Sequence, residues 1–149
     1  MEATKEALIG AMESHFGDDT KRINHAHRVT AYAEQLMGPE GGDYQVVIGS
    51  AVLHDIGIHQ AEKKYGSASG KYQEIEGPPI AREILTGLKF DPSQIDEICE
   101  IIAHHHSPGK ITTQNFKILY DSDWLVNLKD EYDIQDREKL ANIIDRVFL

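Results

Sequence analysis

Apolar residues recur at three- and four-residue spacings along nearly the whole chain, and no segment keeps the strict alternation that is typical of a β-strand. Residues that start or stop helices divide this pattern into seven segments. We expect helices over approximately residues 4–15, 18–37, 43–57, 78–85, 91–106, 112–128 and 136–149. The sequence therefore predicts an all-α fold, a bundle of about six to seven helices in which residues 1–149 form a single domain.

One polar segment interrupts the helical pattern. Residues 62–74 (EKKYGSASGKYQE) are rich in glycine, lysine and tyrosine, and they follow the end of the third expected helix. Two interpretations are open. A solvent-exposed surface loop would have this composition, and so would a lid over a substrate, because long loops inside compact domains often carry function.

Charge and composition exclude several functions. The net charge of −10 argues against a duplex nucleic acid partner, which requires a basic surface, and against an anionic membrane. The N-terminal residues contain no long apolar stretch, so we expect neither a signal peptide nor a membrane span. Cys99 is the only cysteine, which rules out an intrachain disulfide and a cysteine-based zinc site. We expect a cytoplasmic protein.

Histidines and carboxylates fall on the apolar faces of four expected helices. A buried carboxylate or histidine alone has ordinary structural explanations, but several together would leave costly unpaired groups unless they bind a cation. The candidates are His25, His54, Asp55, His104, His105, His106, Asp121 and Asp123. The convergence of these side chains predicts a buried metal centre.

The two histidines of the second expected helix face in different directions. His25 shares one face with apolar residues, namely Val29, Tyr32 and Leu36. His27 is displaced from His25 by roughly 200° around the helix, at about 100° per residue. We therefore expect His25 to face the core and His27 to face outward.

With these residues identified, the chain resembles the HD-domain superfamily of metal-dependent phosphohydrolases, which is named for its His-Asp doublet. The doublet matches residues 53–57 (LHDIG), and the first motif of the family matches residues 25–29 (HAHRV). The terminal aspartate matches residues 121–125 (DSDWL), in which Asp123 is the better match to the ligand. The resemblance covers residues 22–128 and implies an all-α HD-domain fold.

The resemblance also implies one or two divalent metal ions. His25, His54, Asp55 and Asp123 would hold the first ion. Glu76, His104 and His105 would complete a second, which Asp55 would share. Family members often have a histidine where this chain has Glu76, so the sequence does not decide whether a second ion binds. Imidazole and carboxylate ligands together suit Mn, Fe, Co, Ni or Zn.

The expected substrate is a small-molecule phosphate ester, which includes nucleotides. Asp55, Arg28 and Asn127 are the expected catalytic residues, and Asn127 resembles the substrate-side asparagine of the stringent-response hydrolases. Arg28 and several lysines would bind phosphate, namely Lys64, Lys71 and Lys110. Two other functions stay open: a di-iron oxygenase, because some proteins of this fold have a similar ligand order, and a metal-bound regulatory module without turnover.

Overall fold

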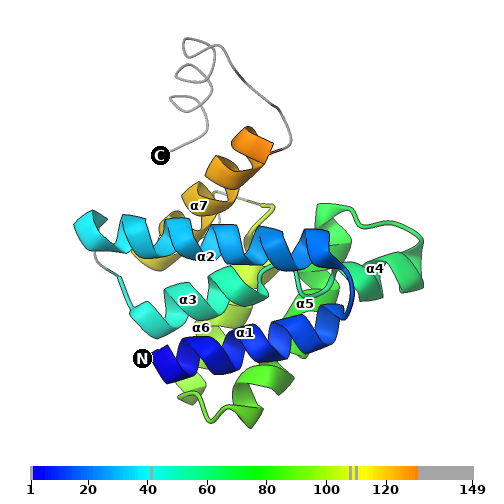
Figure 1. Cartoon of the computed structure of the whole chain (residues 1–149), viewed down its shortest axis with the longest axis horizontal. Helices are drawn as coiled ribbons and strands as arrows, with labels where there is room; N and C mark the ends of the chain where they lie inside the picture. Colours follow the sequence, from blue (N-terminus) through cyan, green and yellow to red (C-terminus); the bar gives the residue numbers. More distant parts are fainter. Residues whose placement is uncertain (1, 41, 108, 110, 131–149) are drawn as a thin grey trace.

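The computed structural model describes residues 2–40, 42–107, 109 and 111–130 (Figure 1). These residues form seven α-helices and no strand. The helices are α1 (Glu2–Phe16), α2 (Thr20–Glu40), α3 (Tyr44–Leu53), α4 (Ile58–Tyr65), α5 (Gly70–Gly87), α6 (Pro92–His104) and α7 (Gln114–Asp130). The predicted all-α fold is therefore confirmed.

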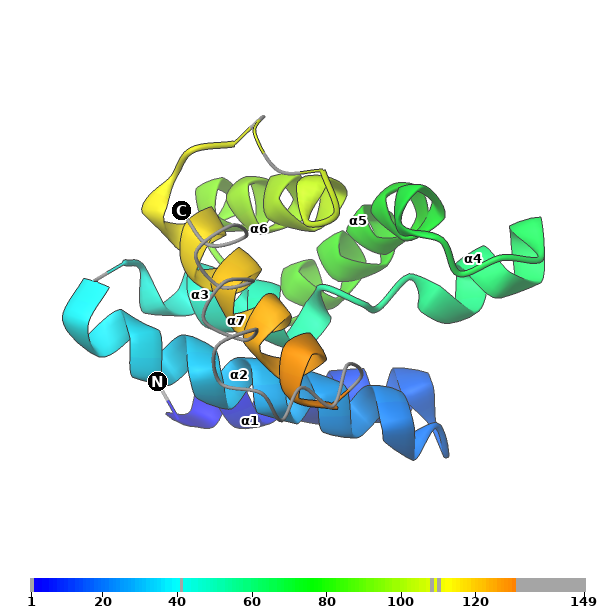
Figure 2. The same ribbon diagram turned by 90° about the horizontal axis from the view of Figure 1, so that it is seen from above.

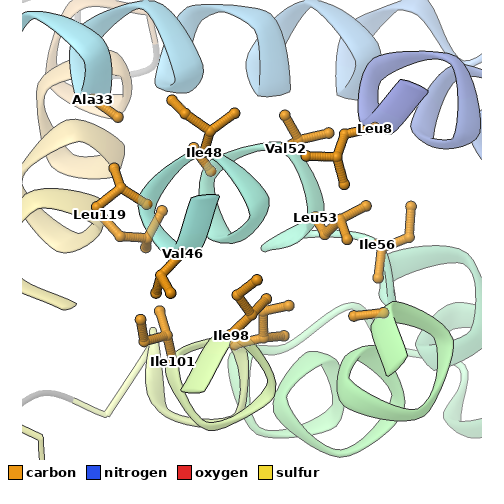
Figure 3. Packing of buried hydrophobic residues seen from close by; sticks show 14 of the residues in the cluster. Leu8, Ala33, Val46, Ile48, Val52, Leu53, Ile56, Ile98, Ile101 and Leu119 are labelled. Carbon is orange, nitrogen blue, oxygen red and sulfur yellow. The ribbon is translucent and has the colours of Figure 1, made fainter. Parts of the chain in front are cut away.

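Helix α3 lies at the centre of the bundle. It is apolar along most of its length, and every residue from Val46 to Leu53 is buried, as expected for a helix that other helices surround. It contacts α1, α2, α6 and α7, and Figure 2 shows α3 and α7 between α2 on one side and α6 on the other. In Figure 3, Ile48 and Val52 point toward α1 and α2, whereas Val46 points toward Ile98 and Ile101 of α6. The His54-Asp55 doublet directly follows this buried helix, and the His54 side chain is itself fully buried.

The polar segment over residues 62–74 is mostly helical, which differs from the loop or lid that the sequence predicts. Only residues 66–69 connect α4 to α5. The turn is possible because Gly66 adopts a left-handed backbone conformation (φ 68°). The rings of Tyr65 and Tyr72 stack across it at 4.2 Å between centroids. The polar composition therefore reflects the solvent-facing sides of two helices.

Helix α5 begins eight residues before the prolines at which the sequence predicts its start. Pro78 and Pro79 lie inside the helix, although each removes a backbone donor. Tertiary contacts support this region, because Gly77 packs against the backbone of Gly57 and the Cys99 thiol donates to the Pro78 carbonyl at 3.6 Å. Helix α4 was not expected at all.

Other boundaries differ by a few residues. Helix α2 continues to Glu40 instead of ending near Met37, and α3 ends at Leu53 instead of near Gly57. The expected helix over residues 136–149 lies outside the described residues. Among the described helices, none combines the length and the apolar character that crossing a membrane requires.

Candidate metal centre

Three helices bring four potential ligands together. His25 comes from α2, His54 and Asp55 follow the end of α3, and Asp123 comes from α7. The His25 Nε2 atom lies 3.1 Å from Asp123 Oδ1 and 3.3 Å from Asp55 Oδ2. The His54 Nε2 atom lies 3.3 Å from both His25 Nε2 and Asp55 Oδ2, and 3.4 Å from Asp123 Oδ1. Side chains that are distant in sequence therefore converge on one point.

Backbone hydrogen bonds orient two of the imidazole rings. The Nδ1 atom of His54 donates to the Ala51 carbonyl at 2.8 Å, and that of His105 donates to the Ile102 carbonyl at 2.6 Å. Each bond turns the other ring nitrogen, Nε2, toward Asp55, as is typical of histidines that ligate metals. The Nε2 atom of His105 is buried, 3.4 Å from Asp55 Oδ1, and has no hydrogen-bond partner among the described residues. A cation would satisfy this atom.

Burial and charge oppose each other at this centre. Burial alone would lower the pKa of His54, but the charges of Asp55 and Asp123 outweigh it and raise that pKa well above its ordinary value. For the Asp55 carboxyl, burial acts in the other direction and would raise the pKa, yet His54 and His105 hold that pKa well below the ordinary range. The pKa of Asp123 is lowered too, because His54 and His25 outweigh the effect of its burial. The carboxylates therefore stay ionised and require a positive partner, either a proton on His54 or a metal ion.

A second group of potential ligands shares Asp55. It consists of Asp55, His105 and His106, whose ligand atoms lie within 4.8 Å of one another. Burial, together with the neighbouring charge of His105, lowers the pKa of His106 to about 4, so this imidazole is neutral near pH 7 and can ligate a metal. The sequence alone does not decide which of the three consecutive histidines bind metal, and His106 is one of the candidates.

Gln73 determines which nitrogen of His106 carries the proton. The Gln73 side-chain amide donates to the Ala68 carbonyl at 2.6 Å, so its oxygen faces His106 Nε2 at 3.1 Å. That oxygen can only accept a hydrogen bond. The proton of His106 therefore lies on Nε2, and Nδ1 carries the lone pair that is available to a metal.

Two expected ligands lie apart from both groups. The Glu76 carboxylate accepts hydrogen bonds from Lys64 at 3.4 Å and from the Tyr65 hydroxyl at 3.1 Å. Because α5 begins at Gly70, Glu76 falls on a turn that faces α4 instead of the histidines. His104 is still part of α6, and its Nδ1 donates to the carbonyl of Glu100, one turn earlier in the same helix.

The outward-facing His27 and Asp121 of α7 are also outside the two groups. His27 Nε2 lies 3.1 Å from Glu13 Oε2, and 41% of the His27 side chain is exposed. This orientation agrees with the helical periodicity. Asp121, which the sequence left open, is buried but belongs to neither ligand group.

A cavity of about 740 Å³ opens onto the centre. His25, Asp55, Asp123 and His106 form part of its wall, and the expected residues Arg28 and Asn127 also line it. Lys64 and Lys71 do not belong to its described lining. Lys64 pairs with Glu76, and Lys71 lies over the Tyr72 ring at 4.8 Å. Lys110 lies outside the described residues.

The cavity is lined by four polar residues that the sequence did not single out as substrate contacts. They are Lys21, Arg22, Asn24 and Gln73. The periodicity of α2 contained a signal for Lys21, which lies four residues before His25 and therefore on the same helical face. Gln73 carried no such signal, because it follows the turn between α4 and α5.

Comparison with known proteins agrees with this geometry. The HD domain family matches residues 22–148, which is most of the chain. Neither the comparison with curated proteins nor the comparison with solved structures gives a match. The chain belongs to the HD-domain family.

Proposed function

We propose that this protein is a metal-dependent phosphohydrolase that acts on a small phosphate ester or nucleotide. One observation carries the proposal: His25, His54 and Asp123 meet Asp55 at the wall of a cavity that is also lined by cationic side chains. The HD-domain family, to which the chain belongs, includes metal-dependent phosphohydrolases.

The donor set fits a divalent transition metal. His25, His54, Asp55 and Asp123 would hold one ion, and Asp55 with His105 and His106 would hold a second. Two imidazoles with one or two carboxylates for each ion suit Mn, Fe, Co, Ni or Zn better than an all-oxygen site would. A divalent ion bound there would acidify a water molecule and neutralise charge on the phosphoryl group.

The side chains around the cavity would position the substrate. Arg28 lies one helical turn from His25 and lines the cavity, where its guanidinium would form charge-assisted hydrogen bonds with phosphoryl oxygens. Asn127, one turn after Asp123 on α7, would offer its amide to the same group. Asp55 would hold the two metal positions together, because it belongs to both ligand groups.

Metal analysis followed by a phosphatase assay tests this function. The protein, purified without added chelator or metal, is analysed for its metal content and then assayed with Mn²⁺ on an aryl phosphate and a panel of nucleotides. We expect phosphate release that a chelator abolishes and added metal restores. A metal-loaded protein that releases no phosphate from any of these compounds would contradict the proposal.

One feature of the centre also favours a second candidate function. Because Asp55 is shared between two histidine-containing groups, the centre would also suit a pair of iron ions that activates oxygen. Iron in the purified protein together with substrate-dependent oxygen uptake would identify an oxygenase. A metal-loaded protein that is inactive in both assays would instead indicate a regulatory module.

A further inference from the structure

We propose that Lys21 and Arg22, at the beginning of α2, form a second anion subsite in the cavity. This subsite would select substrates that carry another negatively charged group beside the scissile phosphate. The proposal rests on the proposed phosphohydrolase function for its substrate class, whereas the anion binding itself can be measured without turnover.

The two cations lie beside the metal centre. Both residues line the cavity that His25, Asp55 and Asp123 also line. Lys21 precedes His25 by four residues, which places the two about 6 Å apart along the helix axis. A small molecule whose phosphate reaches the metal ligands can therefore extend a second charged group to Lys21 and Arg22.

Arg22 is only loosely engaged by its neighbouring carboxylate. Its Nε atom is buried and has no hydrogen-bond partner among the described residues. The Asp19 Oδ2 atom is 3.9 Å from that Nε, beyond the roughly 2.7–2.9 Å of a charge-assisted hydrogen bond. Asp19 Oδ2 instead lies 2.7 Å from His59 Nε2, and Asp19 Oδ1 accepts the backbone N–H of Arg22 at 3.3 Å. Asp19 thus anchors the start of the helix, while the Arg22 side chain, 27% exposed, lines the cavity, where the terminal nitrogens of its guanidinium can bind an external anion.

The local charge around these cations is opposite to the net charge of the whole chain. The protein has a net charge of −10, yet Lys21, Arg22 and Arg28 all line the same cavity. Adjacent cations repel each other, and a bound anion relieves that repulsion. With the Asp55 and Asp123 carboxylates of the lining engaged by a metal ion, the three cations would concentrate anionic ligands in the rest of the cavity.

The other lining residues indicate how the rest of the substrate is recognised. Asn24, Gln73 and Asn127 offer amides, and the described lining contains no Phe, Tyr or Trp ring on which a nucleobase could stack. Recognition would therefore depend on charge and hydrogen bonds. The expected substrate is a small molecule with a phosphate ester and a second phosphate or carboxylate.

Binding of three phosphonates, which are not hydrolysed, tests the subsite. Calorimetry on the full-length metal-loaded protein would compare ethylphosphonate, with one anionic group, against ethylenediphosphonate and phosphonopropionate, whose second group is a phosphonate or a carboxylate. We expect tighter binding of at least one two-anion compound. In Lys21→Gln/Arg22→Gln, that advantage should fall about tenfold, as for the loss of a hydrogen bond to a charged group, while ethylphosphonate binds within about twofold of the parent affinity.

The matched control is Arg82→Gln/Lys89→Gln, which removes the same charge from exposed residues that do not line the cavity. An unchanged advantage in the Lys21/Arg22 variant, or an equal loss in the control, would overturn the subsite. Should the double variant fail to fold by circular dichroism, Lys21→Gln alone decides, because Lys21 is exposed. A protein that shows the advantage but hydrolyses no ester would overturn the proposed function and leave the subsite standing.

Discussion

Gly57 and Gly77 pack backbone against backbone, and this contact joins the segment after the His-Asp doublet to the middle of α5. A Cβ atom at Gly57 would lie 2.5 Å from the amide nitrogen of Gly77 and 2.8 Å from its Cα. Gly57 has an ordinary helical conformation (φ −86°), so the absence of a side chain matters here for space and not for backbone freedom. Because the obstructing atoms are backbone, they cannot turn aside as a flexible side chain could.

Gly57→Ala should therefore destabilise the protein by about 1–3 kcal/mol, the usual cost of overpacking. It should also weaken metal binding, since Gly57 lies two residues after Asp55. Urea unfolding and metal titration measure the two effects. Gly10→Ala is the matched control, because a Cβ there meets nothing within 4 Å, and it should stabilise α1 by about 0.5–1 kcal/mol. Equal stability of the two variants would show that the close contact has no energetic importance.

Asp55→Ala should abolish metal retention and activity, while the helical content stays nearly unchanged. Asp55 belongs to both ligand groups, so its loss removes a ligand from each proposed ion. Elemental analysis and circular dichroism check these outcomes. His27→Ala should retain its metal, because His27 contacts Glu13 at the surface. Loss of metal in the His27 variant would mean that the proposed orientation of α2 is incorrect.

His106→Ala should lower the metal content from two ions per chain to one. Glu76→Gln should retain both ions, because the Glu76 carboxylate is engaged by Lys64 and Tyr65. Gln73→Leu should lower the affinity for the second ion by about 10–100-fold, as is typical when the partner that orients a ligating histidine is lost. Ion counting across a metal titration separates these cases. Loss of the second ion in the Glu76 variant would restore Glu76 as a ligand.

The inward orientation of His25 was predictable from the sequence, and its physical basis is simple. Within a regular helix, the 3.6-residue period determines which side chains share a face. The period thus separates His25 from His27, and it places His54 at the end of the apolar helix α3. The order and spacing of these residues also carried the resemblance to the HD-domain family.

Periodicity could not distinguish His104 from His106, because α6 ends at His104. Beyond that residue the backbone leaves the helix, and the direction of each side chain depends on tertiary contacts such as that between Gln73 and His106. The same limit explains Glu76. Its direction depends on where α5 begins, and a tyrosine stack and a glycine contact stabilise that arrangement. Neither contact leaves a periodic pattern in a polar sequence.

The stability of the metal-free protein should depend on pH in the opposite sense to its metal binding. The pKa of His54 is raised in the folded protein above its ordinary value of 6.5. Its charged form therefore contributes stability below about pH 6.5, and this contribution is lost as the pH rises through the raised pKa. The carboxylates behave in the reverse way. The lowered pKa values of Asp55 and Asp123 give stability above the ordinary value of 3.8, which is lost as the pH falls through those lowered values.

Between about pH 6 and pH 9 only the His54 contribution changes among these three groups, so the metal-free protein should become less stable as the pH rises. A metal ion competes with the proton for His54 Nε2, so metal binding should strengthen over the same range. The difference in Tm between metal-loaded and chelator-treated protein should therefore widen from about pH 6 to about pH 9. Thermal unfolding in matched buffers measures this difference. In the His54→Gln variant, the difference in Tm should no longer depend on pH. A difference in Tm that narrows with rising pH in the parent protein would mean that His54 does not exchange a proton for the metal.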